Sequence, residues 1–436
     1  MSFLHLAGPS LIVTLLFVLR TPITWSLAIG AMSFFLLNLD MIPLSNFAQE
    51  MAEGTQSVSL LALPLFVLAG CIMNASGVTR RLINLADVLV GHLIGALAQM
   101  CTILGVLLGG LTASSNADAA MLAKTLGNQM TAKGYSAAFA AVITSSASII
   151  TALIPPSIGL IIYGFLSETS IGRLFAAGLL PGLVLAIALM MTTRIVAGRR
   201  GYAPQRAVRA SGSEIRRALI DGLWALSIPV VILGGTRYGL FTTTESGAIV
   251  VLYVLFIAIF AYGEFRVKDI PSVLAEAVRD SATVMMMICA AAAFGFYLSW
   301  EAVPQGMSGW LENATDNPVL LLLIINVVLI ILGTAIEGSA ALIILTPVLM
   351  PIVTKAGIDP VHFGIVFITN LTIAGVTPPV GGMMYIASQI LRVPMMDYAR
   401  EVWPFLLALM GVLVLLSVFP QISLLLPDLI YGTASP

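Results

Sequence analysis

The sequence is poor in charged residues and in the reactive residues that most enzymes use. Only 9% of its 436 residues are charged and the formal net charge is −1, so nothing in the composition favours nucleic acid as a partner. Cys71, Cys101 and Cys289 lie in apolar stretches without CxxC spacing, so neither a disulfide framework nor a zinc site is indicated. The sequence has no GxxxxGK[ST] phosphate-binding loop, which argues against an ATP-driven permease.

Apolar residues make up most of the chain. Hydrophobic residues account for 59% of it, and the mean hydropathy of +1.03 predicts a polytopic helical membrane protein. Residues 3–19 lack a basic n-region and a cleavage site and are predicted to be a retained span. They could form one long bent helix with the next span. The predicted spans are 3–19, 22–38, 58–76, 172–196, 219–236, 243–262, 280–300 and 400–420.

A pair of prolines interrupts an apolar stretch at residues 149–163, IITALIPPSIGLIIY. Pro155 and Pro156 have no amide hydrogen, so the carbonyls of Thr151 and Ala152 lose their helical partners. Unpaired carbonyls are costly in hydrocarbon and are tolerated only inside protein or beside a wet cavity, where a bound cation can satisfy them. The segment is therefore predicted to be two half-helices beside a cation site.

The same pattern occurs again at residues 372–386, TIAGVTPPVGGMMYI, at an offset of 378 − 155 = 223 residues. One ungapped shift by this offset superimposes six glycine or proline positions over about seventy residues. The general frequency of glycine and proline in membrane helices does not explain a shared register, so two structural repeats are predicted. The superimposed pairs are Gly110 and Gly333, Gly134 and Gly357, Pro155 and Pro378, Pro156 and Pro379, Gly159 and Gly382, and Pro181 and Pro404.

Each repeat is predicted to carry an apolar hairpin ahead of its broken helix. The hairpins, 94–130 and 320–354, turn at tips of small polar residues, TASSNAD and TAIEGSA. We expect both hairpins to re-enter the membrane and meet the broken helices, 136–165 and 361–390, near its midplane. A plain helix-turn-helix with a solvated tip is the alternative.

The second arm of each hairpin is predicted to begin at a serine cap. Ser115 has Asp118 three residues on, the spacing of a capping box, and Ser339 occupies the corresponding place in the second tip.

The repeats set the predicted domain organisation. Residues 1–198 form the first repeat, with scaffold spans 3–38 and 58–76. Residues 199–218 form a basic linker. Residues 219–420 form the second repeat, with scaffold spans 219–262 and 280–300, and residues 421–436 form a C-terminal tail.

The basic linker predicts the orientation, because lysine and arginine are enriched in cytoplasmic loops. If the linker is cytoplasmic, 17 of the 20 basic residues lie on that side. Five crossings per repeat is an odd number, so the second repeat is predicted to be inverted, with both chain ends periplasmic.

The residues that carry these features resemble the large membrane subunit of tripartite ATP-independent periplasmic (TRAP) transporters, the DctM family. The resemblance covers nearly the whole chain and implies a sodium-coupled, elevator-type importer of organic acids in the bacterial inner membrane. It also implies a small four-helix membrane subunit and a periplasmic substrate-binding protein as partners. The matching segments are LLALPLFVLAGCIMNASG (60–77), GLTASSNADAA (110–120), ALIPPSIGLIIYG (152–164), LFAAGLLPG (174–182), VILGGTRYGLFTTTESGA (231–248), LIILTPVLMPIVTKAGIDPVHFGI (342–365) and TPPVGG (377–382).

The sequence departs from the family pattern in two places. Members often carry glutamate where Cys71 stands, and a Ser-Gly-Ser tip where this chain has Ala113, Ser114 and Ser115, with Asn116 additional. These differences concern the identity of the substrate and not the class of protein.

The residue pattern and the resemblance together predict two sodium sites and one substrate site. Sodium prefers oxygen ligands, so backbone carbonyls at the breaks are suitable. The first sodium site is predicted at Gly109, Thr112, Thr151, Ile154 and Pro156, and the second at Gly333, Ala374, Thr377 and Val380. The substrate site is predicted between the tips, at Ser114, Ser115, Asn116, Glu337, Gly338 and Ser339. Glu337 is either a functional intramembrane acid or a carboxylate held by the start of a helix.

An enzyme is the alternative class. Residues 306–309, GMSG, match the GxSG string of a hydrolase, which would make the chain an intramembrane hydrolase. The string falls in a predicted outer loop, and the three histidines lie near span ends without an HExxH pair. A transporter is therefore favoured.

The predicted topology can be tested by cysteine labelling in a variant whose native cysteines are replaced. A cysteine at Gly212 should react only with a membrane-impermeant reagent on the cytoplasmic side, and one at Asn313 only from the periplasm. Reaction of both from the same side would exclude the inverted arrangement.

Overall fold

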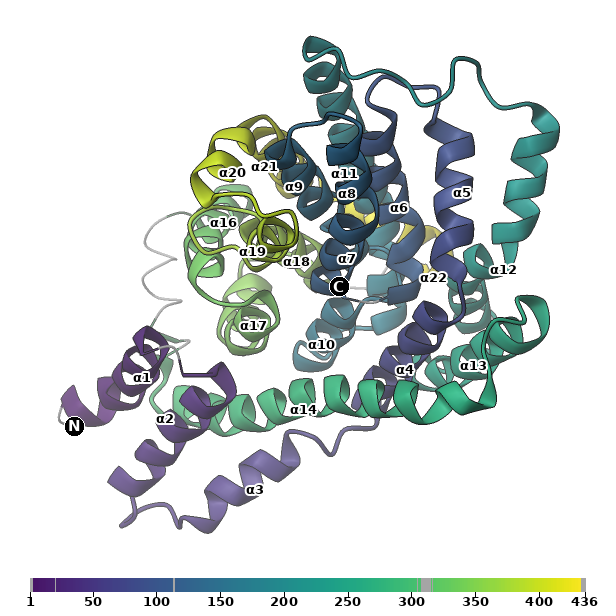
Figure 1. Cartoon of the computed structure of the whole chain (residues 1–436). Helices are drawn as coiled ribbons and strands as arrows, with labels where there is room; N and C mark the ends of the chain where they lie inside the picture. The colour runs from purple at the N-terminus through teal and green to yellow at the C-terminus, as the bar shows by residue number, and fades with distance from the viewer. Residues whose placement is uncertain are drawn as a thin grey trace.

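The computed structural model of the chain is entirely helical over the residues that it describes (Figure 1). Seven of these helices are long and apolar enough to cross a membrane, or up to eight if a pair bent by 56° counts as one span. The chain is therefore a multi-pass helical membrane protein, as its composition predicts. The described residues are 3–19, 21–112, 114–303, 305–306, 315 and 317–432.

The first half of the chain begins with two separate helices, α1 (Phe3–Val18) and α2 (Ile23–Leu37), and not with one bent helix. Its other helices are α3 (Ser45–Glu53), α4 (Ala62–Ala75), α5 (Val78–Val90), α6 (Ala96–Thr112), α7 (Ser115–Leu122), α8 (Asn128–Ala132), α9 (Ala137–Ala147), α10 (Ile158–Leu166) and α11 (Ile171–Arg199). Short 3-10 turns lie at Val58–Leu61 and Ile150–Ala152, and a π-turn at Ala123–Gly127 joins α7 to α8.

The second half begins after the basic linker. Its helices are α12 (Gly212–Arg237), α13 (Thr243–Phe256), α14 (Ile270–Trp300), α16 (Pro318–Ala335), α17 (Gly338–Lys355), α18 (Pro360–Ala374), α19 (Gly382–Ile390), α20 (Met395–Glu401), α21 (Trp403–Val418) and α22 (Gln421–Tyr431). A π-turn at Ile257–Ala261 extends α13, and a 3-10 turn at Val267–Asp269 precedes α14.

Helices in the two halves begin at corresponding positions. A shift of 223 residues carries the first residue of α6 to 319, that of α9 to 360 and that of α10 to 381, where α16, α18 and α19 begin at 318, 360 and 382. The hairpin and broken helix therefore occur twice in the same order. The inversion of one half relative to the other stays a prediction.

Several helices differ from the predicted spans. Helices α3 and α5 were not expected, and α14 begins ten residues before the predicted span at 280. The pattern of α5 explains the omission, because Leu82 and Leu85 are buried while Arg80 is exposed, so the helix is amphipathic and lacks a long apolar run.

The predicted C-terminal tail also contains a helix, α22. It packs along α11, and the Arg173 Nη2 atom lies 2.7 Å from the Asp428 Oδ1 atom. This contact holds the end of the chain against the first half.

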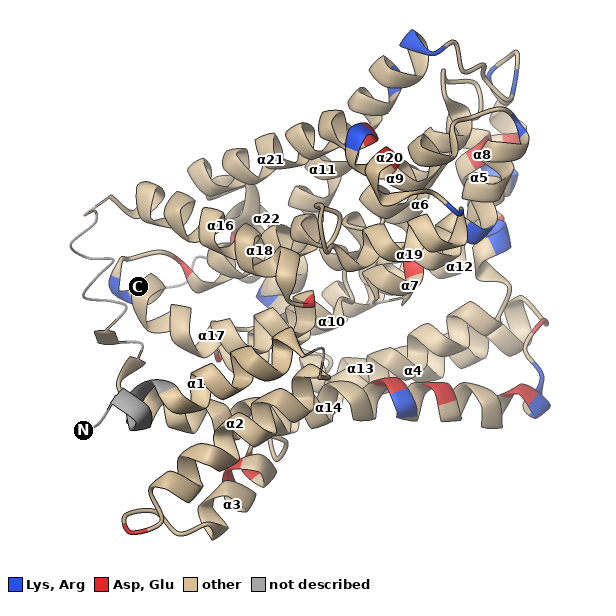
Figure 2. Cartoon of the chain, turned by 60° about the vertical axis from the view of Figure 1, so that its left-hand side comes forward, with Lys and Arg blue, Asp and Glu red and all other residues tan. Residues whose placement is uncertain are grey.

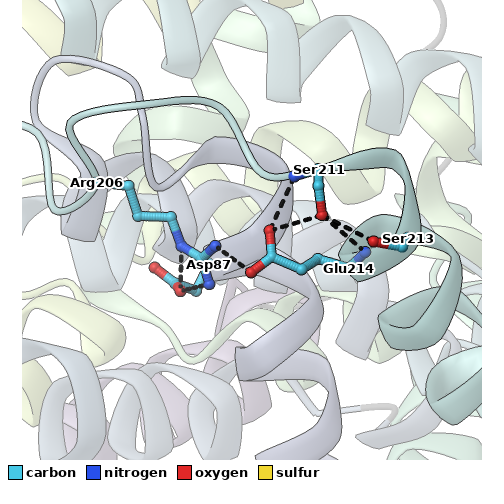
Figure 3. A network of polar contacts seen from close by, with 5 residues as sticks. All are labelled: Asp87, Arg206, Ser211, Ser213 and Glu214. Carbon is cyan, nitrogen blue, oxygen red and sulfur yellow. Dashed lines mark hydrogen bonds and ion pairs between the residues drawn. The ribbon is translucent and has the colours of Figure 1, made fainter.

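The basic linker crosses one end of the molecule, where most lysine and arginine residues gather (Figure 2). Figure 3 shows its main polar network: the Arg206 guanidinium contacts Asp87 of α5 at 2.8 Å, and Ser211 and Glu214 form a capping box at the start of α12. The stacked rings of Tyr202 and Tyr135, with centroids 4.1 Å apart, join the linker to the turn before α9. The linker therefore binds the hairpin-bearing part of the first half to α5 and α12.

Helix α11 packs closely against the first proline break. A Cβ atom added at Gly178 would lie 2.0 Å from the Leu153 carbonyl oxygen, so only glycine permits this approach. Gly198, near the end of the same helix, has no heavy atom within 4 Å of an added Cβ.

These two glycines allow a matched stability test. Gly178→Ala should destabilise the protein by about 1–3 kcal/mol, the cost of overpacking a filled interior. Gly198→Ala should leave stability unchanged or raise it by up to about 1 kcal/mol, because alanine favours helix. Thermal unfolding of both variants in detergent is the measurement. Equal unfolding midpoints for the two variants would show that α11 is not tightly packed against the break at Gly178.

Candidate functional site

The first proline break leaves two carbonyls without backbone partners. Among the described backbone hydrogen bonds outside helices, none reaches the carbonyl oxygen of Thr151 or Ala152, and both residues are buried. The Pro155–Pro156 peptide bond is cis, and so is Pro378–Pro379. The predicted loss of helical partners is therefore present at the first break.

At the second break the carbonyls have hydrogen-bond partners, and the side chains are more exposed to the surroundings. The carbonyl of Ala374 accepts a hydrogen bond from the Thr377 amide at 3.0 Å, and the Gly375 carbonyl accepts one from Met384 at 3.3 Å. The Val380 side chain is 47% exposed, whereas Pro156 is buried. The two breaks are thus related in sequence but not identical in structure.

A glycine in the first arm of each hairpin touches the break of the same half. An added Cβ at Gly109 would lie 2.5 Å from Ile154 Cβ, and one at Gly333 would lie 2.7 Å from Ala374 Cβ. Contacts this short exclude any side chain at either glycine. The structure therefore brings two pairs of predicted sodium-site residues together, Gly109 with Ile154 and Gly333 with Ala374.

The second arm of each hairpin packs on the broken helix of the other half. Helix α7 contacts α19, and α17 contacts α10 (Figure 1). At the first of these contacts, Asn116 Oδ1 lies 3.8 Å from the position of a Cβ added at Gly382. Each break is consequently enclosed by a hairpin arm from each half of the chain.

The caps of the hairpin arms differ from those predicted. Ser114, and not Ser115, is the N-cap of α7, and its hydroxyl oxygen accepts from the Ala117 amide at 3.4 Å. Ser115 is the first helical residue, and its hydroxyl instead accepts a hydrogen bond from Thr151 at 3.3 Å. The predicted capping box at Ser115 is therefore wrong.

The second tip shows a similar shift. Glu337 is the N-cap of α17, and its carboxylate accepts from the Ala340 amide at 3.1 Å. Ser339 donates a hydrogen bond to the same carboxylate at 3.0 Å, so the predicted serine cap is wrong. Glu337 is exposed, so its carboxylate caps the helix and is also accessible from outside the protein. Gly338 is half-buried beside Leu371.

The predicted substrate residues lie in two separate groups. In the first tip, Asn116 is exposed and Ser114 and Ser115 are half-buried. Among the described residues, no hydrogen bond joins these three to Glu337 or Ser339 in the second tip. The structure therefore places polar groups at both tips without a hydrogen bond between these groups among the described residues.

Asp118 is a buried acid that was assigned only a capping role from the sequence. Its side chain is 1% exposed, its Oδ2 atom accepts a hydrogen bond from the Thr112 hydroxyl at 2.5 Å, and its Oδ1 atom has no partner. Thr112 belongs to the predicted first sodium site, so the carboxylate lies at that site. The signal in the sequence was an acid inside a membrane segment, which is rare and usually functional.

The second part of each broken helix starts without a side-chain cap. Helix α10 begins after Ser157 and α19 after Gly381, and neither helix has a side-chain hydrogen bond capping its first turn. The amide groups of such a turn favour anions. The first break therefore combines carbonyl oxygens without backbone partners, which suit a cation, with a helix start, which suits an anion.

The GxSG string of the hydrolase alternative falls largely outside the described residues, since of positions 306–309 the structure describes only Gly306.

Comparison with known proteins agrees with this architecture. Residues 10–422 match the family described as the tripartite ATP-independent periplasmic transporter, DctM component. The chain is 39% identical over 411 residues to the sialic acid TRAP transporter large permease protein SiaM of Vibrio cholerae, covering 94% of this chain and 96% of that protein. It is 38% identical to the 2,3-diketo-L-gulonate large permease YiaN of Escherichia coli, covering 93% and 94%.

A solved structure shares the fold. The YdaH transporter of Alcanivorax borkumensis matches with a TM-score of 0.63 and 14% identity, covering 89% of this chain and 88% of that one. The fold and the paired breaks define a multi-pass helical membrane protein, and the sequence match specifies its family. The chain belongs to the DctM family of TRAP transporter large permeases, and this family is not enzymatic.

Proposed function

We propose that this chain is the sodium-coupled, membrane-spanning permease of a TRAP importer for small organic acids. The observation that carries the proposal is the first break, where two buried carbonyls without backbone partners lie beside a hairpin that contains a buried carboxylate. Oxygen ligands and one negative charge suit a monovalent cation. Relatives named for sialic acid, 2,3-diketo-L-gulonate and C4-dicarboxylates all handle carboxylic acids, which supports this substrate class.

The first sodium site is proposed to include Asp118 together with the predicted ligands. Thr112 and Thr151 both contact the residues of the first tip, through hydrogen bonds to Asp118 and Ser115. A bound cation would neutralise the buried carboxylate, whose second oxygen lacks a protein partner. Binding of sodium would thereby stabilise the packing of hairpin against break.

The substrate carboxylate is proposed to bind at the start of α19, beside Asn116. The amide groups in the first turn of α19 have no side-chain cap, and Asn116 supplies a polar side chain 3.8 Å from a Cβ position at Gly382. Glu337 would exclude a second carboxylate from the other tip, because like charges repel there.

The static part of the transporter is proposed to be formed by the helix pairs α1–α2 and α12–α13. Trp25, Leu223 and Leu252 on these helices expose 58%, 59% and 68% of their side chains, as expected for surfaces that meet lipid or another membrane protein. We infer that the small four-helix subunit docks here, that a periplasmic binding protein delivers the acid, and that the hairpin-bearing parts move as an elevator. The linker side would face the cytoplasm of a bacterial inner membrane.

The proposal is tested by uptake of labelled organic acids into proteoliposomes that contain this chain and the small subunit. Uptake should require both an inward sodium gradient and the cognate binding protein. Uptake that proceeds equally with potassium in place of sodium would contradict the proposed coupling.

Variants at the first break test whether the two prolines create a cation site or only bend the helix. Pro155→Ala with Pro156→Ala should let the chain re-form helical hydrogen bonds, each worth about 1 kcal/mol, so thermal stability should not fall. Removing carbonyl ligands from a cation costs about 1.5–3 kcal/mol, so the sodium concentration for half-maximal uptake should rise at least about tenfold.

The control is Pro427→Ala, which removes a proline inside α22 and should leave sodium dependence unchanged. A stable double variant with unaltered sodium dependence would assign the prolines a structural role only.

Asp118→Asn tests the proposed carboxylate ligand. The variant keeps the size of the side chain and a partner for Thr112 but removes the charge, so it should unfold at an equal or higher temperature without sodium. Stabilisation by added sodium should be lost. Asp428→Asn, which breaks the contact between α22 and α11, should retain the sodium-induced shift. Retention of the shift in Asp118→Asn would remove this residue from the site.

A further inference from the structure

A cysteine and two carboxylates meet where α4 packs on α14. The Cys71 Sγ atom and one carboxylate oxygen each from Glu276 and Asp280 all lie within 4.8 Å of one another. Cys71 comes from the first half of the chain and the two acids from the second. Figure 2 shows acidic positions in red along the α14 ribbon, and Figure 1 shows α4 beside the same helix, with which it packs.

The two acids repel each other in the absence of a cation. Glu276 and Asp280 are four residues apart on one helix, so their side chains lie on the same face, where like charges are destabilising. Among the described residues, neither acid has an ion pair with a lysine, arginine or histidine. A bound cation would remove this repulsion.

The thiol is an independent indication of a ligand. The Cys71 side chain is only 7% exposed, has no hydrogen-bond partner among the described residues and points at the two carboxylates. The other two cysteines differ, because Cys101 is fully buried among apolar residues and Cys289 lies 4.0 Å from the Thr55 hydroxyl. Only the first of the three thiols faces a pair of acids.

We propose that Cys71, Glu276 and Asp280 bind a borderline-soft divalent cation such as Zn²⁺. One sulfur and two oxygen ligands, with water as the fourth, match the tetrahedral preference of zinc. Mg²⁺ and Ca²⁺ prefer sites made of oxygen alone and do not fit a thiolate. On binding, the thiol releases its proton to solvent and the sulfur forms the bond to the metal.

The bound metal would fasten α4 to α14 next to the first hairpin. Gly70, the residue before Cys71, packs against the carbonyl oxygens of Leu111 and Thr112, which lie 3.0 and 3.3 Å from an added Cβ. A metal at Cys71 therefore joins the two halves of the chain at a helix that touches the hairpin tip. The CxxC spacing typical of zinc sites is absent, so the sequence did not indicate this arrangement.

The experiment uses Co²⁺ as a spectroscopic probe on the purified full-length chain in metal-free buffer. Co²⁺ should produce a thiolate charge-transfer band in the near ultraviolet that saturates at one metal per chain, and Zn²⁺ should displace it. Cys71→Ser should abolish the band. Glu276→Gln with Asp280→Asn should weaken binding at least about tenfold, as loss of metal partners does.

Cys289→Ser and Cys101→Ser are the matched controls and should keep the band. Zn²⁺ should also raise the unfolding temperature of the parent and of Cys289→Ser, but not of Cys71→Ser. A band that survives in Cys71→Ser, or displacement by Mg²⁺ as readily as by Zn²⁺, would overturn the proposal. The absence of a Co²⁺ band would also overturn it. Cross-links from Glu276 and Asp280 to basic residues of the small subunit would then show that these acids bind that subunit and not a metal.

Discussion

The structure depends on one constraint, which is that a backbone carbonyl in a membrane interior must have a partner. Proline pairs break two helices and deprive carbonyls upstream of the amide groups that would normally satisfy them. Other parts of the protein surround the first break. Gly109 and Gly178 lie so close to the break that any side chain would collide with it, and the residues that carry the two unpaired carbonyls are buried. The need to satisfy these oxygens is the reason for proposing a cation site at this break.

The two breaks meet this constraint in different ways. At the first break the carbonyls lack backbone partners, and the nearby hairpin carries the buried carboxylate of Asp118. At the second, Ala374 and Gly375 already accept hydrogen bonds, and a shift of 223 residues places Ala341 where Asp118 stands. Among the described residues, a buried carboxyl group therefore stands at only one of these two related positions. We therefore propose that the first break is the stronger of the two proposed cation sites, since the carboxyl group and the unpaired oxygens coincide there.

The hairpins also join the two halves into one unit. Each hairpin contacts its own break with its first arm and the broken helix of the other half with its second. Each hairpin is therefore packed against parts of both broken helices. In the same region Tyr398 donates a hydrogen bond to the Val376 carbonyl and lies 2.8 Å from the Ser145 hydroxyl oxygen, which ties the second break to α9 of the first half.

The sequence by itself determined the membrane class, the two proline breaks, their offset and the family. These are local or compositional properties: a proline lacks its amide hydrogen in any fold, and a run of apolar residues remains apolar. Tertiary structure decided which polar groups meet. It replaced the predicted cap at Ser115 by Ser114, directed Asp118 to Thr112, and placed Cys71 beside two acids of α14. Such contacts depend on the angles at which helices distant in the sequence pack against each other. The spacing of residues along the sequence does not predict those angles.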